Sequence, residues 1–440
     1  KVSDSIGGKG VLWELFSFNP AHLNLYVRLC ASSPYLTGIL TSNPGMIDEL
    51  MDSLVLDRLP GEDSLRRSLE ELCRGAEDTG PIIHSFKNSQ HLRVGVRDIL
   101  GKADIRETHR VLSDVAEVLL QQIAHAEYER LLPKYGTPIV AEGPRTGQVC
   151  ELVILAMGKL GGREPNYHSD LDVIFLYEQE GSTRPSPRHR KAQSTSNQHF
   201  FSELGQRIIK VMGQLGPQGQ LYEVDARLRP TGRSGALACP LTIFDRYFET
   251  GQGQLWEREA LCKARPVYGS EEARRAAMVS VNRAILNPSW EPANAEAIRQ
   301  MRLRMEEGAS PYNLKRGAGG RVDLEFTVQM LQLQNAATYP TVLVPGTFEA
   351  LDELRSAGCL TAEEYETMSR SYRLLRGVEA RLRLLNTTAR HDLPQEEGEL
   401  RRLAYLLRHP NPQALHDECL ETMAENRKLF DRLFDRAAEA

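Results

Sequence analysis

Two stretches of the chain decide the fold, and they read ELVILAMGKLGG at residues 151–162 and SDLDVIFLY at residues 169–177. Short runs of Val, Ile, Leu and Phe, bounded by glycines or polar residues, are typical of buried β-strands. We therefore expect strands at 151–157 and 171–177. A third stretch, LYEVDA at 221–226, alternates apolar and polar residues as a half-buried strand does.

The second predicted strand opens with two carboxylates, Asp170 and Asp172. Side chains two residues apart on a strand point to the same face, so these two lie side by side. A bare D-x-D pair also occurs on strands whose acids face solvent. Asp172, however, lies within an apolar run, where a buried and unpaired charge is costly. Asp225, in the third predicted strand, joins the pair if that strand lies beside the second.

Grouped carboxylates suit a divalent cation. Mg²⁺ prefers carboxylate and phosphate oxygens and keeps several waters, and three carboxylates can hold two ions about 4 Å apart. The sequence therefore predicts that Asp170, Asp172 and Asp225 are catalytic and are the metal ligands. The expected metal is Mg²⁺, as two ions, with Mn²⁺ as an alternative.

Glycines and cations near these acids predict a nucleotide site. Glycines at a strand end let backbone N–H groups approach phosphates closely, and arginines can bind phosphate through bidentate contacts. For Lys159 and Lys315 a solvated surface role stays open. The predicted nucleotide-binding residues are Gly158, Lys159, Gly161, Gly162, Ser169, Arg227, Arg229 and Lys315.

Helical periodicity surrounds the three predicted strands. Predicted helices cover 46–56, 106–132, 198–215, 347–354, 361–385, 396–407 and 410–440. Between them, 135–147 is expected to be a connection and 178–197 an irregular, mobile polar loop; after Pro230 only a Gly-rich turn and helices are expected. The predicted fold is α+β, with N-terminal helices at 1–140, a small mixed β-sheet core at 141–270 and a C-terminal helical bundle at 271–440.

Composition excludes several classes of protein. The chain has 440 residues and a net charge of -5, so we expect no nucleic acid partner. Its longest apolar runs fall short of the roughly 18 residues of a membrane span, so no membrane is expected either. Seven scattered cysteines without a CxxC pair favour a reducing, cytoplasmic location. The chain begins at Lys1, and we expect it to be a piece of a longer protein.

The glycine-acid arrangement resembles the nucleotidyltransferase superfamily of DNA polymerase beta, although Gly158-Lys159 matches that family's Gly-Ser pair only in its glycine. It resembles more closely the bifunctional glutamine synthetase adenylyltransferase/adenylyl-removing family. The motifs that carry this closer resemblance are GKLGG at 158–162 with SDLD at 169–172, YEVDARLRP at 222–230, WE at 256–257 with KAR at 263–265, and NLKRGAGGRVDLEF at 313–326.

That resemblance implies one half of a two-half, multifunctional enzyme, because the chain contains one carboxylate triad. One half of the family's enzyme moves AMP from ATP onto a tyrosine of glutamine synthetase with release of pyrophosphate, which regulates nitrogen assimilation. The other half removes AMP by phosphorolysis and releases ADP. The segment 222–227 looks like the C-terminal, adenylylating half. The implied partners are ATP, glutamine synthetase and a nitrogen-signalling regulatory protein.

Two alternatives remain beside the adenylylating half. The deadenylylating half uses the same residue types, and GRSG at 232–235 suits either half. A non-catalytic nucleotide-sensing module is the alternative outside the enzymes, and it predicts loss of at least one of the three carboxylates. Sequence also leaves open whether several nearby polar residues face the nucleotide or have a structural role: His168, Trp256, Glu257, Lys263, Arg265, Asp323 and Glu325.

Overall fold

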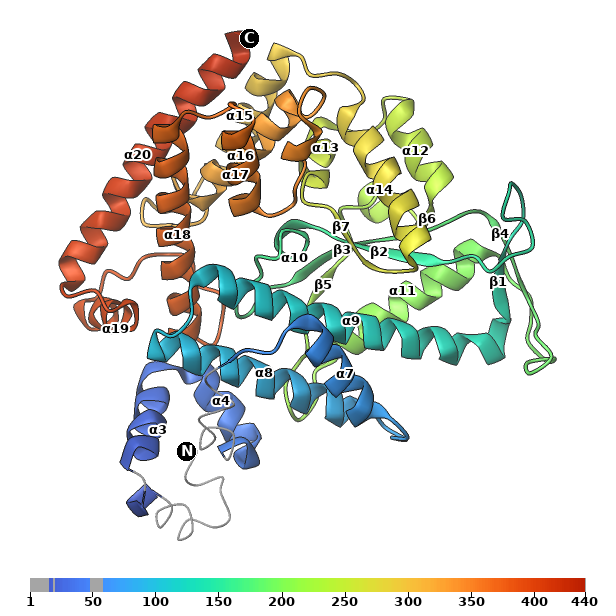
Figure 1. The fold of residues 1–440 in the computed structure, drawn as a ribbon, viewed down its shortest axis with the longest axis horizontal. Coiled ribbons are helices and arrows are strands. Elements are labelled where there is room, and N and C mark those ends of the chain that lie inside the picture. The colour runs from blue at the N-terminus through green and yellow to red at the C-terminus, as the bar shows by residue number, and fades with distance from the viewer. Residues whose placement is uncertain (1–15, 19, 48–57, 440) are drawn as a thin grey trace.

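The computed structural model describes residues 16–18, 20–47 and 58–439. A small β-sheet lies at the centre of the molecule, with the N-terminal helices on one side and the C-terminal helices on the other (Figure 1). The predicted α+β class is therefore confirmed. Of the helix predicted at 46–56, only residues 46 and 47 are described, and the rest lies outside the described residues.

The central sheet is mixed. Its strands run in the order β5-β3-β2-β7, and β6 also pairs with β3. The pairs β2-β3 and β2-β7 are antiparallel, whereas β3 is parallel to both β5 and β6. The strands are β2 (Leu152–Ala156), β3 (Leu171–Tyr177), β5 (Val224–Asp225), β6 (Ala238–Pro240) and β7 (Arg265–Tyr268).

The sequence prediction for this sheet holds for β2 and β3 and needs correction elsewhere. The strand predicted at 221–226 shortens to the two residues of β5, and β6 and β7 lie where only helices were expected. Strands of two to four residues contain too little alternation for a pattern to reveal them. They form because the long β2 and β3 offer backbone hydrogen bonds at their edges.

A second, two-stranded sheet joins β1 (Thr137–Val140) and β4 (Gly181–Arg184) antiparallel. The predictions of a plain connection at 135–147 and an irregular loop at 178–197 were therefore wrong in part. Asn197 holds the pair in place, since its amide Nδ2 donates to the Ile139 carbonyl at 3.0 Å and to the Gln179 carbonyl at 3.1 Å. Such side-chain contacts to distant backbone leave no local sequence pattern.

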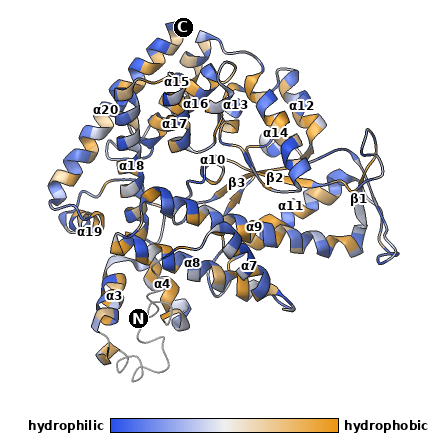
Figure 2. Cartoon of the chain, in the orientation of Figure 1, coloured by the Kyte–Doolittle hydropathy of each residue, from blue (hydrophilic) through white to orange (hydrophobic). Residues whose placement is uncertain are grey.

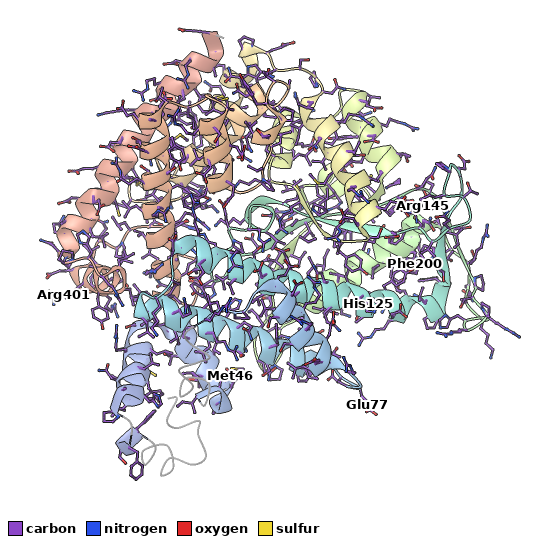
Figure 3. The ribbon with its side chains drawn as sticks, in the orientation of Figure 1. Met46, Glu77, His125, Arg145, Phe200 and Arg401 are labelled. Atoms are coloured by element: carbon purple, nitrogen blue, oxygen red, sulfur yellow. The ribbon has the colours of Figure 1, made fainter. Side chains whose placement is uncertain are left out.

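The N-terminal helices pack beneath the sheet. They are α3 (Pro20–Ser32), α4 (Pro34–Ser42), α7 (Glu62–Cys73), α8 (Gly80–Leu100) and α9 (Ile105–Tyr135). The helix predicted at 106–132 is confirmed in α9, and the one at 198–215 in α11 (Asn197–Gly213). The ring of Phe200 on α11 meets Tyr128 of α9 edge-on at 5.6 Å, between the two helices (Figure 3).

The C-terminal helices confirm the predicted helical region. They are α12 (Leu241–Glu249), α13 (Leu255–Leu261), α14 (Glu271–Leu286), α15 (Pro292–Glu306), α16 (Arg321–Asn335), α17 (Thr347–Ser356), α18 (Ala362–Leu385), α19 (Glu397–Leu407) and α20 (Pro412–Glu439). Polar and apolar residues alternate around the long helices (Figure 2). Among the described helices, none is long and apolar enough to cross a membrane.

A glycine turn locks α20 against the start of α16. Gly319 has a φ of +71°, and a Cβ there would collide with the carbonyl oxygen of Met423 on α20. Asn426, one turn further along α20, donates from its amide to the Gly319 carbonyl at 3.0 Å. Backbone therefore touches backbone at a position that only glycine fits.

We predict that Gly319→Ala lowers the free energy of unfolding by more than about 1 kcal/mol, because it adds left-handed strain to the collision. Gly377→Ala is the matched control: this glycine lies inside α18 with open space at its Cβ, and alanine favours helices. Thermal unfolding of both variants is the measurement. A Gly319→Ala melting temperature equal to that of Gly377→Ala would contradict the turn's role.

Candidate active site

The sharp turn after β2 brings Gly158 against the first residues of β3. The short helix α10 (Gly158–Gly161) begins there, and Gly158 has a φ of +52°. A Cβ on Gly158 would overlap the carboxylate oxygen Oδ2 of Asp172. Glycine is therefore required for two reasons, the backbone angle and the close approach of an acidic side chain.

The sheet aligns the predicted acids. β3 and β5 are parallel, with Asp172 directly opposite Asp225, as expected if the third strand lies beside the second. Asp170 is exposed, just before β3. Burial, and then the negative charges of Asp170 and Asp225, raise the pKa of Asp172 to about 7. The three carboxylates therefore share one electrostatic environment.

Asp225 is turned toward its own arginine. Its carboxylate accepts from the Arg227 backbone N–H at 2.9 Å and from the guanidinium Nε at 2.7 Å, and these hydrogen bonds lower its pKa. Among the described residues, no three His, Cys, Asp or Glu side chains already converge as a metal cluster. The metal role of Asp170, Asp172 and Asp225 stays a prediction.

The chemistry of this donor set fits a divalent cation. Carboxylates whose mutual repulsion raises a pKa are relieved when a cation lies between them. The negative charges of Asp170 and Asp225 raise the pKa of Asp172, and the positive charges of Lys159 and Lys315 lower it. A cation shared by the three carboxylates would require the Asp225 side chain to rotate away from Arg227.

A pocket of about 580 Å³ opens directly beside Asp172. Gly158 and Lys159 form its floor with Asp172, and three helices supply its walls. Each helix contributes residues spaced by three and four, which is one helical face. These wall residues are Trp256, Glu259 and Ala260 of α13, Met301, Arg304 and Met305 of α15, and Arg321, Val322, Glu325, Phe326 and Gln329 of α16; Leu228, Lys263 and Lys315 complete the lining.

Two lysines of this pocket lack an acidic partner. Within the described chain, neither the Lys159 nor the Lys315 ammonium group makes an ion pair within 4 Å or a side-chain hydrogen bond. Burial lowers the pKa of both, most strongly for Lys159, where the charge of Arg321 adds to the effect. Unpaired buried cations beside carboxylates are suited to bind a phosphate chain.

The other predicted nucleotide-binding residues lie elsewhere. A Cβ at Gly161 would collide with the Lys263 carbonyl, and one at Gly162 would lie 3.0 Å from the Pro345 carbonyl, so both glycines serve close packing. Ser169 is buried, and its hydroxyl accepts from the Asn166 N–H at 2.9 Å.

The two predicted arginines also have other partners in this structure. Arg227 holds Asp225, and Arg229 donates to the Ala226 carbonyl at 2.6 Å, which closes the loop after β5. The structure thus brings Gly158, Lys159, Lys315 and Asp172 together in one pocket. It gives Gly161, Gly162, Ser169, Arg227 and Arg229 contacts that shape the surrounding backbone.

A buried carboxylate that sequence reasoning missed joins the core to the C-terminal helices. Glu164, between α10 and β3, is 3% exposed. It accepts hydrogen bonds from the Thr347 backbone N–H at 2.8 Å, from the Lys263 ammonium at 3.1 Å and from the Tyr372 hydroxyl at 3.1 Å. A single Glu in a Gly-Pro-rich loop gives no sequence signal for such a role.

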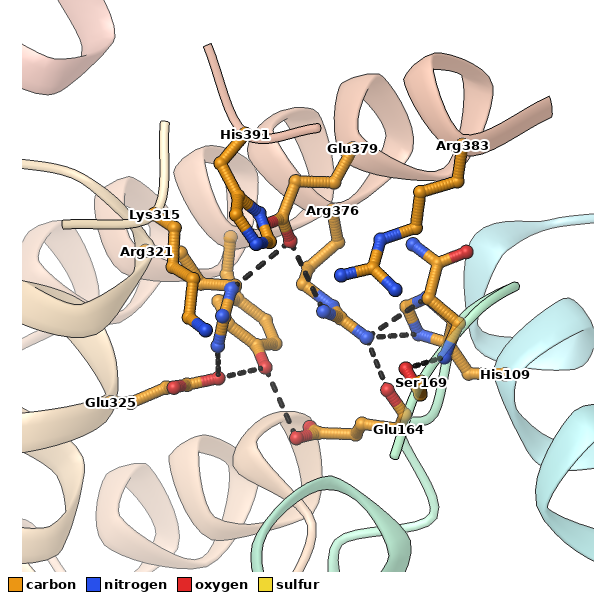
Figure 4. A network of polar contacts seen from close by, with 12 residues as sticks. His109, Glu164, Ser169, Lys315, Arg321, Glu325, Arg376, Glu379, Arg383 and His391 are labelled. Atoms are coloured by element: carbon orange, nitrogen blue, oxygen red, sulfur yellow. Dashed lines mark hydrogen bonds and ion pairs between the residues drawn. The ribbon is translucent and has the colours of Figure 1, made fainter. Parts of the chain in front are cut away.

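The network continues across α16 and α18. Tyr372 also donates to Glu325 at 3.0 Å, Glu325 pairs with Arg321, and Arg321 reaches Glu379 at 3.0 Å (Figure 4). Arg376 pairs with Glu379 at 3.2 Å and donates to the Glu164 carbonyl. Every member is buried except Glu325, which is partly exposed, so the charges are mutually dependent.

Most of the residues left open by sequence prove structural. Lys263 binds Glu164, Arg265 donates to buried Glu117 at 2.8 Å, and Asp323 lies between Arg302 and Arg427. Glu257 closes a capping box with Gln254, and His168 packs edge-on against Tyr35. Burial lowers the pKa of His168 to about 4, which disfavours a charged form. Trp256 lines the pocket, and so do Lys263 and Glu325 beside their structural contacts.

A buried aromatic chain fixes the strand that carries Asp225. Tyr222 hydrogen bonds to His91 of α8 at 2.9 Å, and the other nitrogen of that ring bonds to Tyr35 of α4 at 2.6 Å. All three side chains lie between the N-terminal helices and β5. The helices before the core therefore position the third carboxylate.

The sequence of this chain is similar to those of known proteins. Residues 23–279 match the family model of glutamate-ammonia ligase adenylyltransferase. The chain belongs to this nucleotidyltransferase family. Residues 293–434, which supply α15, α16 and α18 to the pocket and network, match a second model, GlnD PII-uridylyltransferase.

Curated relatives agree with the family. The bifunctional glutamine synthetase adenylyltransferase/adenylyl-removing enzyme of Pseudomonas putida is 30% identical over 426 residues, which cover 95% of this chain and 43% of the relative. The enzyme of the same name from Thioalkalivibrio sulfidiphilus is 33% identical over 397 residues, covering 88% of this chain and 40% of the relative. The chain therefore spans less than half the length of these relatives. Adenylyltransferases of this family generally use ATP with a divalent metal.

We predict that Glu164→Ala lowers the free energy of unfolding by about 3–5 kcal/mol, because it leaves the Lys263 ammonium buried without its partner. The double variant Glu164→Met/Lys263→Met should recover most of that loss, since apolar side chains can replace a buried pair. Urea unfolding of the three proteins is the measurement. A single variant as stable as the parent would show that Glu164 does not join the two regions.

Proposed function

We propose that this chain transfers AMP from ATP to a tyrosine of glutamine synthetase and releases pyrophosphate. The observation that carries the proposal is the pocket beside Asp172, where Lys159 and Lys315 have no acidic partner and three helices add apolar walls. Cations in the lining suit a triphosphate, and apolar and aromatic side chains of the same pocket suit a base.

The chemistry requires positioning and charge neutralisation, with no nucleophile from this chain. The tyrosine oxygen bonds to the α-phosphorus of ATP, the bond from that phosphorus to the bridging oxygen breaks, and pyrophosphate leaves with its electrons. The phenolic proton passes to water. Bound Mg²⁺, as two ions held by Asp170, Asp172 and Asp225 and with Mn²⁺ as an alternative, would neutralise the triphosphate and activate the attacking oxygen.

The chain's own residues do the rest. Gly158 lets the turn approach the phosphates beside Asp172, Lys159 and Lys315 bind them, and the α13 and α16 faces exclude water from the base. The name of these relatives includes both adenylyl transfer and adenylyl removal. The segment Tyr222–Arg227 supports the adenylylating direction, and phosphorolysis to ADP is the alternative. The match of 293–434 to a PII-uridylyltransferase model supports a nitrogen-signalling regulatory protein as a further partner.

Intact-mass spectrometry of unmodified glutamine synthetase tests the proposal. After incubation with this chain, ATP and Mg²⁺, we expect each modified subunit to gain the mass of one AMP group. Loss of AMP from pre-modified enzyme in the presence of phosphate, without any gain in the first assay, would assign the opposite direction. ATP binding with neither reaction would favour the non-catalytic nucleotide sensor.

We predict that Asp172→Asn lowers the transfer rate by more than about 100-fold, because even outer partners of a metal site are worth 10- to 100-fold. The fold should persist, since Asn preserves the side chain's volume. Asp435→Asn, on the exposed face of α20, is the control and should keep the parental rate. Transfer at the parental rate in Asp172→Asn would remove this residue from the catalytic set.

We predict that Lys315→Met raises the KM for ATP by about 10- to 150-fold, the value of one lost hydrogen bond to a charged group. Lys315→Arg keeps the positive charge and should retain most of the affinity. Steady-state kinetics with varied ATP and saturating Mg²⁺ separates KM from kcat. If Lys315→Met and Lys315→Arg have the same KM for ATP, Lys315 lies outside the phosphate site.

A further inference from the structure

One wall residue of the pocket has an unsatisfied polar atom. Glu259 on α13 is 3% exposed, lines the pocket beside Asp172, and its carboxyl oxygen Oε1 has no hydrogen-bond partner among the described residues. A buried polar atom without a partner costs folding free energy. Such a group is retained at a site where a ligand satisfies it.

The surroundings of Glu259 identify its chemical form. Burial raises the pKa of its carboxyl well above the ordinary value, and no cation offsets that effect. The nearest described polar contact is structural: the Gln329 amide of α16 donates to the Glu259 main-chain carbonyl at 3.0 Å, which fixes α13 against α16. An un-ionised carboxyl offers one O–H donor and one C=O acceptor side by side.

The same wall presents flat and apolar groups. Trp256 lies one turn before Glu259 on the pocket face of α13, and Phe326 and Met305 face the pocket from α16 and α15. Aromatic and thioether groups of this kind bind a planar ring by stacking and edge contacts. Lys159 and Lys315 line the same pocket with Asp172, and we assign the phosphates to these cations and the nucleoside end to this wall.

We propose that the Glu259 side chain reads the edge of the nucleotide base, donating one hydrogen bond to adenine N1 and accepting one from the N6 amino group. This inference rests on the proposed function, since it takes ATP as the donor nucleotide. Trp256 and Phe326 hold the ring between them, and Glu259 fixes its rotation. Glu259 is thus a specificity-determining residue that the carboxylate triad and the glycine turn do not include.

The test compares two nucleotides, ATP and purine riboside 5′-triphosphate, which lacks only the N6 amino group. Binding to the full chain is measured by titration calorimetry with Mg²⁺ and without glutamine synthetase. The parent should bind ATP about tenfold more tightly than the analogue, because the analogue leaves the Glu259 carbonyl unpaired.

Two variants separate the chemistry from simple packing. Glu259→Gln keeps a donor and an acceptor in the same positions and should preserve the preference for ATP. Glu259→Leu keeps the bulk and should bind both nucleotides equally. Melting temperatures of both variants show that the fold persists, and Glu259→Gln remains informative if Glu259→Leu unfolds.

The outcomes distinguish this inference from the function on which it rests. A parent that binds neither nucleotide overturns the proposed function. A parent that binds both equally, or a Glu259→Leu variant that still prefers ATP, overturns the role of Glu259 while the function stands. If the Glu259→Gln variant loses the preference for ATP, the Glu259 carboxyl does not bind the base in its un-ionised form.

Discussion

The buried carboxylate of Glu164 is the contact on which the arrangement of the molecule depends. It lies in the loop that leads to Asp170 and Asp172, and its partners come from the loop before β7 and from α17 and α18. A buried charge is tolerated only when its partners satisfy it fully. Glu164 therefore ties the position of the acidic strand to the position of the C-terminal helices.

This tie explains why the pocket forms between two regions that match different family models. Residues of the sheet provide Gly158, Lys159 and Asp172, whereas α15 and α16 provide the walls and the loop between them provides Lys315. Neither region alone contains a complete site. The two regions also share a charged contact, because Arg376 of α18 pairs with Glu379 and donates to the Glu164 carbonyl of the core region. Under the proposed function, nucleotide binding therefore depends on docking of these helices against the sheet.

The sequence predicted the parts of this site that follow from local pattern. β2 and β3 are apolar runs that the pattern predicts, and Asp225 lies opposite Asp172 because β5 pairs with β3, a pairing that the sequence left as a condition. The features that the sequence could not predict depend on contacts between residues far apart in the chain. β1 and β4 form through Asn197 and backbone pairing, Gly161 is needed because the Lys263 carbonyl approaches it, and Glu164 gains its role only from α17 and α18. On α13, a face that mixes Trp256, Glu259 and Ala260 is equally consistent with surface or pocket until α16 is placed against it.

The most direct test of the central claim is a crystal structure of the chain with Mn²⁺ and α,β-methylene-ATP, whose α–β bridge cannot be cleaved by transfer. Anomalous scattering would locate the metal independently of the nucleotide. The account predicts Mn²⁺ at Asp170, Asp172 and Asp225, with the phosphates at Lys159 and Lys315. Density for the analogue in the separate pocket between α7 and α9, lined by Arg66, His125 and Tyr268, with no metal at the three carboxylates, would contradict it.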